Sequence, residues 1–183
     1  MTISRPQGEE IVRVPMPWED YLLTDDGPYE YYGGHCVVSP PASMRHAGIA
    51  RRLDHAVTAS LPAGLTLTRD AGWSPPDVRE LLSPDLMVHP PAEDLLWLEE
   101  PPALVVEILS SNRRDDLVAK VQRYAAWGAP DYWIVDPRDR VILTMRNDAG
   151  IFVETGRFTG GRVTLRYGDH AVEVDVDELL GPS

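Results

Sequence analysis

The chain has 183 residues, of which 43% are hydrophobic and 25% are charged. These proportions are ordinary for a soluble globular protein, and the length suits one domain with its own core. The net charge of −12 argues against an ordinary nucleic-acid-binding protein, because such proteins are basic. An acidic chain that binds DNA needs a local basic face or a metal ion that bridges it to phosphate; otherwise its partner is of a different kind.

Membrane insertion and secretion are not expected from the sequence. No apolar run approaches the roughly 20 residues that a membrane-spanning helix needs, and the N-terminal MTISRPQGEE has no apolar stretch typical of a signal peptide. The one cysteine, Cys36, cannot form an intrachain disulfide, which favours a reducing cytoplasm. We expect Cys36 to be a buried or half-buried residue without chemistry, since no base lies near it in the sequence.

The predicted elements begin after a loose lead-in at residues 1–14. A short helix is predicted at residues 18–23, behind two prolines. Strands at residues 29–32 and 35–38 flank Gly33-Gly34, which is typical of a hairpin. A helix at residues 43–61 follows, because its apolar residues recur at helical spacing, with Ser43 as the candidate N-cap.

The second half of the chain is mostly short strands. Apolar runs and turn residues predict a loop at 71–83, a helix at 112–127, strands at 65–69, 86–88, 104–109, 131–135, 141–146 and 151–155, a hairpin at 162–167 and 171–174, and a helical turn at 177–180. No linker or repeat divides the chain. The pattern predicts a single α/β or α+β domain over residues 1–183, with a mixed central sheet flanked by helices and added hairpins.

Glu107 is the unusual residue of the predicted strand at 104–109. An ionised carboxylate among apolar residues is costly unless it is paired or binds a metal. Side chains alternate along a strand, so Glu107 shares a face with Val105 and Leu109. One interpretation is a strand end, where Glu107 points into solvent; the other is a functional site.

Two further residues favour the functional interpretation. Asp85 opens the short apolar strand of SPDLMV, and Lys120 lies on the helix after Glu107, beside its apolar arc. Two acids at the ends of neighbouring strands, with a lysine nearby, are typical of a site for Mg²⁺ or Mn²⁺. The plainer alternative for Lys120 is a surface ion pair with Asp116, four residues earlier.

Three segments carry a family resemblance: SPDLMV, LVVEILS and DDLVAKVQRYAAWGAPDYWIVDP. Together they resemble the Uma-two family of restriction endonucleases, within the PD-(D/E)xK nuclease superfamily. The resemblance spans about residues 18–180 and implies the restriction-endonuclease-like fold. It also implies a metal-dependent endonuclease that hydrolyses DNA phosphodiester bonds.

The resemblance assigns roles to five residues. Asp85 and Glu107 match the two acids that hold the metal, and Lys120 matches a catalytic lysine moved onto the following helix, since Leu109 occupies its usual place. Glu30 resembles an early glutamate that completes the metal site; the alternative is an exposed hairpin residue. His46 matches an accessory histidine that touches phosphate or positions Glu30; the alternative is a helix-end or packing residue.

Other residues have simpler expected roles. Asp77, in a second Pro-Asp pair, competes with Asp85, but no apolar strand follows it. Tyr124 and Trp133 are expected in the core, Asp136 in a proline turn, and the pair Arg113 and Arg114 at a helix start, within reach of a phosphate backbone.

Two functions from different classes remain at this point. One is the metal-dependent endonuclease, acting on DNA as a homodimer, since two cuts on a duplex are easiest with two symmetric copies. The other is an inactive module of nuclease ancestry that works in binding or regulation, which the acidic charge favours.

Overall fold

The computed structural model describes residues 11–24, 30–92, 95–110 and 114–182, without the side chains of residues 114–116. Its centre is a six-stranded sheet whose spatial order follows the chain: β4 (Thr66–Arg69), β5 (Leu86–His89), β6 (Leu104–Ile108), β7 (Asp131–Asp136), β8 (Val141–Asp148) and β9 (Ile151–Phe158). Neighbours are antiparallel except β6 and β7, which are parallel. The sheet is therefore mixed, as the sequence predicts.

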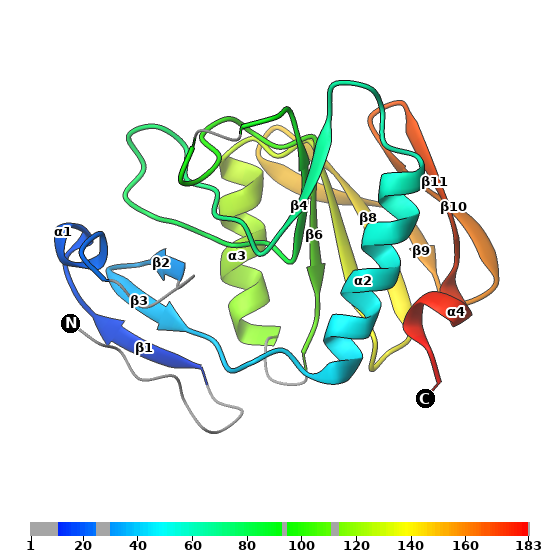
Figure 1. The fold of residues 1–183 in the computed structure, drawn as a ribbon, viewed down its shortest axis with the longest axis horizontal. Helices are drawn as coiled ribbons and strands as arrows, with labels where there is room; N and C mark the ends of the chain where they lie inside the picture. Colours follow the sequence, from blue (N-terminus) through cyan, green and yellow to red (C-terminus); the bar gives the residue numbers. More distant parts are fainter. Residues whose placement is uncertain (1–10, 25–29, 93–94, 111–113, 183) are drawn as a thin grey trace.

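A parallel pair needs a crossover, and here the crossover is a helix. Helix α3 (Arg114–Ala126) connects β6 to β7 and packs on one face of the sheet, where Tyr124 meets Val105 and Tyr132. Alternate residues of the same strands point to the other face, which helix α2 (Met44–Ala59) covers through Ile49 and Leu53. Figure 1 shows the two long helices on either side of β6.

The remaining elements form two smaller sheets and two short helices. Strands β10 (Arg162–Tyr167) and β11 (His170–Asp175) form a hairpin that packs on the α2 face together with α4 (Val176–Leu180). Helix α1 (Trp18–Tyr21) precedes a sheet of order β1-β3-β2, with β1 (Val12–Pro15), β2 (Glu30–Tyr32) and β3 (His35–Val38). No helix within the described ranges is both long and apolar enough to cross a bilayer.

Most predicted elements are confirmed within a few residues. Gly33 and Gly34 both have positive φ, 59° and 76°, as the two-residue hairpin between β2 and β3 requires. Ser43 caps α2 by accepting a hydrogen bond from the His46 N–H at 3.1 Å. Cys36 is fully buried, and burial raises the pKa of its thiol, in agreement with an inert cysteine.

The prediction of a loose lead-in at residues 1–14 is wrong for the last residues of that segment. Residues 12–15 form β1, paired with β3 from Val12↔Val38 to Pro15↔His35. The strand is largely exposed, so it lacks the buried alternate residues that mark a strand in the sequence. Pairing with a distant strand, rather than local propensity, creates it.

Candidate metal and catalytic site

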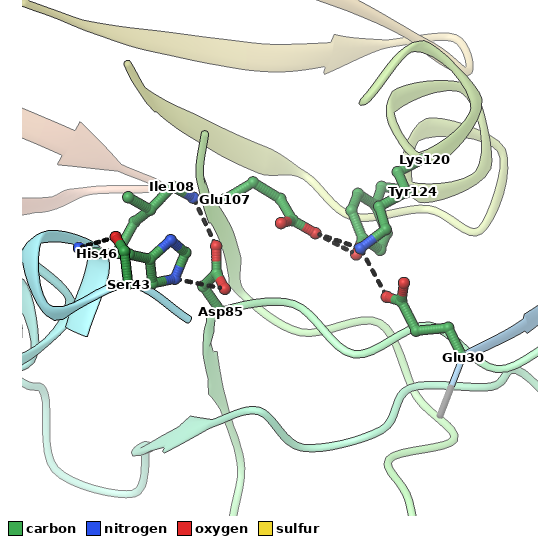
Figure 2. A network of polar contacts seen from close by, with 8 residues as sticks. All are labelled: Glu30, Ser43, His46, Asp85, Glu107, Ile108, Lys120 and Tyr124. Carbon is green, nitrogen blue, oxygen red and sulfur yellow. Dashed lines mark hydrogen bonds and ion pairs between the residues drawn. The ribbon is translucent and has the colours of Figure 1, made fainter. Parts of the chain in front are cut away.

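The candidate residues gather where β6 and β7 end. Because β5 runs antiparallel to β6, with Leu86 opposite Val106, Asp85 just before β5 lies level with Glu107 near the end of β6. The first turn of α2 contributes His46, α3 contributes Lys120, and β2 of the small sheet contributes Glu30. Figure 2 shows these side chains close together, in two sets of polar contacts.

Glu107 is buried, with 3% of its surface exposed. Its Oε1 accepts a hydrogen bond from the Tyr124 hydroxyl at 2.8 Å and lies 3.3 Å from Lys120 Nζ. The interpretation of Glu107 as a solvent-facing residue at a strand end is therefore wrong. An ammonium and a phenol from α3 compensate the burial of this carboxylate.

Lys120 is also buried, at 2% exposure, and it bridges two acids. Its Nζ lies 2.6 Å from Glu30 Oε1, in addition to the contact with Glu107. A surface position for Lys120 is wrong, although the side chain of Asp116 itself lies outside the described part. Asn112 and Arg113 are not described either, nor is the side chain of Arg114, so the structure does not test a basic pair there.

Glu30 is not the exposed hairpin residue that the sequence left open. It is 5% exposed, and its Oε1 accepts a hydrogen bond from the Ser83 N–H at 2.9 Å. Its Oε2 is buried and has no hydrogen-bond partner within the described part of the chain. A buried carboxylate oxygen without a donor is costly, so a bound cation at this oxygen would relieve the cost.

Asp85 forms a second group beside the first. Its Oδ2 accepts a hydrogen bond from the Ile108 N–H at 2.7 Å, and its Oδ1 lies 3.0 Å from His46 Nε2. The contact shown for His46 is thus with Asp85 rather than with Glu30. The competing Asp77 is exposed in a turn at φ 64°, so its position gives it no place in this network.

The two groups differ in the direction of their carboxylates. Figure 2 shows Glu107 directed at Lys120 and Tyr124, whereas Asp85 is directed at His46 and the Ile108 N–H. No three His, Cys, Asp or Glu residues of the described ranges are gathered in a ready-made metal site. The donor chemistry nevertheless fits a hard divalent cation, because three carboxylates are available and one oxygen of Glu30 has no donor.

Two tyrosines of α3 and β7 complete the surroundings. Burial, followed by the charges of Glu107 and Glu30, raises the pKa of Tyr124 well above its usual value. Burial and the charges of Glu107 and Asp85 do the same for Tyr132. Both phenols therefore stay protonated, and Tyr124 remains a hydrogen-bond donor to Glu107.

The sequence model of the Uma2 family, described as "Putative restriction endonuclease", matches residues 18–166. The chain belongs to the Uma2 family. This confirms the Uma-two resemblance of the three sequence segments.

A solved structure confirms the predicted mixed α/β fold of this chain. The crystal structure of "a putative nuclease belonging to DUF820" from Anabaena variabilis aligns with a TM-score of 0.75 and 15% identity. The alignment covers 91% of this chain and 98% of the other. No curated protein matches the sequence.

In this Uma2 chain, the structure confirms the expected roles of several residues outside the candidate site. Leu109, at the usual place of the lysine, packs against the apolar cluster on the α3 face. Trp133 is buried core, and its indole N–H donates to the Arg166 carbonyl at 3.1 Å. Asp136 accepts hydrogen bonds from the N–H groups of Arg138 and Asp139, so it organises its proline turn.

Tyr124 is the site residue of this Uma2 chain that its sequence did not reveal. It is the core residue that the pattern predicts, yet it also bonds Glu107. The available signal is its spacing from Lys120, because residues four apart share one helix face.

Replacing Tyr124 by phenylalanine removes only the hydroxyl group that donates to Glu107. We expect the variant to unfold with a free energy lower by about 1.5–3 kcal/mol, the usual contribution of a hydrogen bond to a charged group. Urea denaturation measures this difference. Tyr132→Phe is the matched control, because the Tyr132 hydroxyl is buried and makes no hydrogen bond with the described residues. An equal loss in both variants would contradict the prediction.

Proposed function

We propose that this chain is a metal-dependent endonuclease that hydrolyses phosphodiester bonds of DNA. The observation that carries the proposal is the buried Lys120, whose ammonium lies within ion-pair distance of Glu107 and Glu30. A cation held between two acids beside a third acid is a costly arrangement for a fold that needs only stability. Membership of the Uma2 family, whose description reads "Putative restriction endonuclease", supports the same activity.

Each residue of the network has a proposed role. Asp85 and Glu107, with Glu30, would hold Mg²⁺ or Mn²⁺; when bound, such an ion polarises a phosphoryl oxygen and makes water more acidic. Lys120 orients the attacking water and offsets the charge that grows on the phosphate. The water oxygen forms a new bond to phosphorus, the bond to the leaving oxygen breaks, and that oxygen takes up a proton.

His46 and the Ile108 N–H position Asp85 in this proposal. Each donates to a different oxygen of the carboxylate, which fixes the plane of the carboxylate group. Partners of this kind orient metal ligands and raise the affinity of a site for its ion.

The acidic chain has basic residues near the proposed site. Arg45, in the first turn of α2, is exposed and donates to the Pro137 carbonyl at 3.1 Å, and Arg138 is exposed in the adjoining turn. Both lie at the sheet end that carries Asp85 and Glu107, where they are able to meet phosphates of the DNA backbone. A homodimer, with one site per strand of a duplex, is part of the proposal and is tested by light scattering during gel filtration.

The test of the activity is cleavage of supercoiled plasmid and of single-stranded DNA with Mg²⁺ or Mn²⁺. We expect nicking by the wild type that is lost with a chelator and in Lys120→Ala. Asp131→Asn is the control, because Asp131 is a buried acid at the opposite end of the sheet, bound to Arg146. Equal nicking by all three proteins would indicate a contaminant.

The second candidate function is an inactive nuclease-fold module in binding or regulation, which the net charge of −12 favours. Thermal melting separates the two. A metal site raises the melting temperature with Mn²⁺, because an ion that binds only the folded state stabilises it. Absence of both a Mn²⁺-dependent rise and nicking would support the module.

A further inference from the structure

The proposed site depends on the docking of a separate sheet. Glu30 belongs to β2 of the three-stranded sheet, whereas Lys120 belongs to α3, which covers the six-stranded sheet. Figure 1 shows β2 and β3 beside α3. The Glu30 carboxylate therefore reaches Lys120 only when β2 lies against α3 in one register.

Two contacts repeat along this line. Glu30 and Tyr32 lie on the same face of β2, since they are two residues apart. Lys120 and Arg123 are neighbours on α3, since they are three residues apart. Glu30 meets Lys120 at 2.6 Å, and the Tyr32 ring lies 4.9 Å from the Arg123 guanidinium carbon. Two successive residues on one face of β2 thus contact two neighbouring residues on one face of α3.

Arg123 is held in place by Glu80 of the loop before β5. Its Nε donates to Glu80 Oε2 at 2.7 Å and its Nη2 donates to Oε1 at 2.9 Å, so the pair is bidentate. Arg123 also donates from Nη1 to the Ala119 carbonyl of its own helix. The guanidinium is therefore fixed from two sides while it covers Tyr32.

Glu80 also binds the turn of the hairpin. Its Oε1 accepts a hydrogen bond from the Gly33 N–H at 2.9 Å. Burial opposes ionisation of Glu80, but the hydrogen bonds from Arg123 and Gly33 outweigh it and lower the pKa of the carboxyl. One carboxylate thus joins three segments: the hairpin β2–β3, the loop before β5, and α3.

We infer that Arg123 and Glu80 are positioning residues that set the register of β2 against α3 and so hold the Glu30 carboxylate at Lys120. The inference rests on the proposed function, in which Glu30 helps to hold the divalent cation. Glu80 binds the Gly33 N–H and Arg123 lies over the Tyr32 ring, so both residues contact the hairpin that carries Glu30 and act through it.

The experiment is calorimetric titration with Mn²⁺ of the wild type, Arg123→Ala, Arg123→Lys and Glu80→Gln. We expect Arg123→Ala and Glu80→Gln to weaken Mn²⁺ binding by about tenfold, which is typical for partners that orient a metal ligand. Arg123→Lys keeps the charge but loses the bidentate geometry, so its loss is intermediate. Arg146→Ala is the matched control, because Arg146 forms a comparable pair with Asp131 at the far end of β7.

A double-mutant cycle separates positioning from a general loss of stability. In a Glu30→Gln background, Arg123→Ala is expected to cause no further loss of Mn²⁺ affinity, because the carboxylate that it positions is already gone. Unchanged affinity in Arg123→Ala alone, or additive losses in the double variant, would overturn the inference.

Hydrogen exchange tests the positioning role of Arg123 even if the protein neither binds Mn²⁺ nor cleaves DNA. If the wild type binds no Mn²⁺, the proposed function fails, and the register is then judged by the protection of the amides of residues 30–32. Protection that falls in Arg123→Ala but not in Arg146→Ala supports the positioning role. Equal protection in the two variants overturns it.

Discussion

Glu107→Gln is expected to abolish metal-dependent cleavage while leaving the fold intact. The substitution replaces the Glu107 carboxylate, a metal ligand of the proposed site, by an amide. Losing several kcal/mol of transition-state stabilisation corresponds to a cleavage rate lower by about 10³-fold. The amide oxygen still accepts the Tyr124 hydrogen bond. The charges that remain, Lys120 and Glu30, form a balanced pair at 2.6 Å. The free energy of unfolding is therefore expected not to fall.

Plasmid nicking and urea denaturation of the same preparations check both parts of this prediction. Asp131→Asn serves as the control, since it neutralises a buried acid that binds Arg146 and the Gly168 N–H away from the site. This control is expected to lose stability and keep its cleavage rate. Cleavage by Glu107→Gln at the wild-type rate would end the catalytic assignment of this residue.

Lys120→Met is expected to have the opposite stability signature. The substitution leaves Glu107 and Glu30 buried without the cation between them. Removing one partner of a buried ion pair costs about 3–5 kcal/mol, because the remaining charge is uncompensated. Cleavage is also expected to fall by about 10²–10³-fold, the usual effect of removing a group that stabilises transition-state charge.

Restoring charge balance tests the cause of the stability loss. The triple variant Lys120→Met, Glu30→Gln, Glu107→Gln removes both acids together with the cation, so most of the lost free energy of unfolding is expected to return. Urea denaturation measures the three stabilities. If the triple variant stays as unstable as Lys120→Met, the loss arises from packing of the lysine stem and not from uncompensated charge.

Together these variants separate function from structure at one site. If Glu107→Gln loses cleavage while its free energy of unfolding rises or stays the same, Glu107 serves the chemistry at the expense of stability. A structural ion pair would instead lose stability on either substitution.

Local patterns were sufficient for most of the elements. The helical spacing of Ile49, Leu53 and Val57 and the cap at Ser43 predicted α2, and Gly33-Gly34 predicted the first hairpin. The strand β1 was not predictable, because it is exposed and exists only through pairing with β3. Local signals report local free energy, whereas an edge strand depends on a partner distant in the chain.

The site residues were predictable to different degrees. Glu107 was conspicuous, since a charged residue inside an apolar run has few stable explanations. Asp85 and Lys120 were placed by their order in the chain and by the family resemblance. The hydroxyl contact of Tyr124 was hidden, because an aromatic residue at a core position gives no sign of which polar atom its tip meets.

The sequence by itself determined the α/β class, the mixed sheet with its helices, and an acid within an apolar strand that is explained either by a strand end in solvent or by a functional site. Only the tertiary structure decided which partner each acid has: Glu107 and Glu30 share Lys120, while Asp85 takes His46 and the Ile108 N–H. The physical reason is the distance along the chain over which each kind of interaction acts. Periodicity and capping act over a few residues, but these contacts join residues 13 to 90 positions apart along the chain. Their geometry follows from how sheets and helices pack, which no local pattern records.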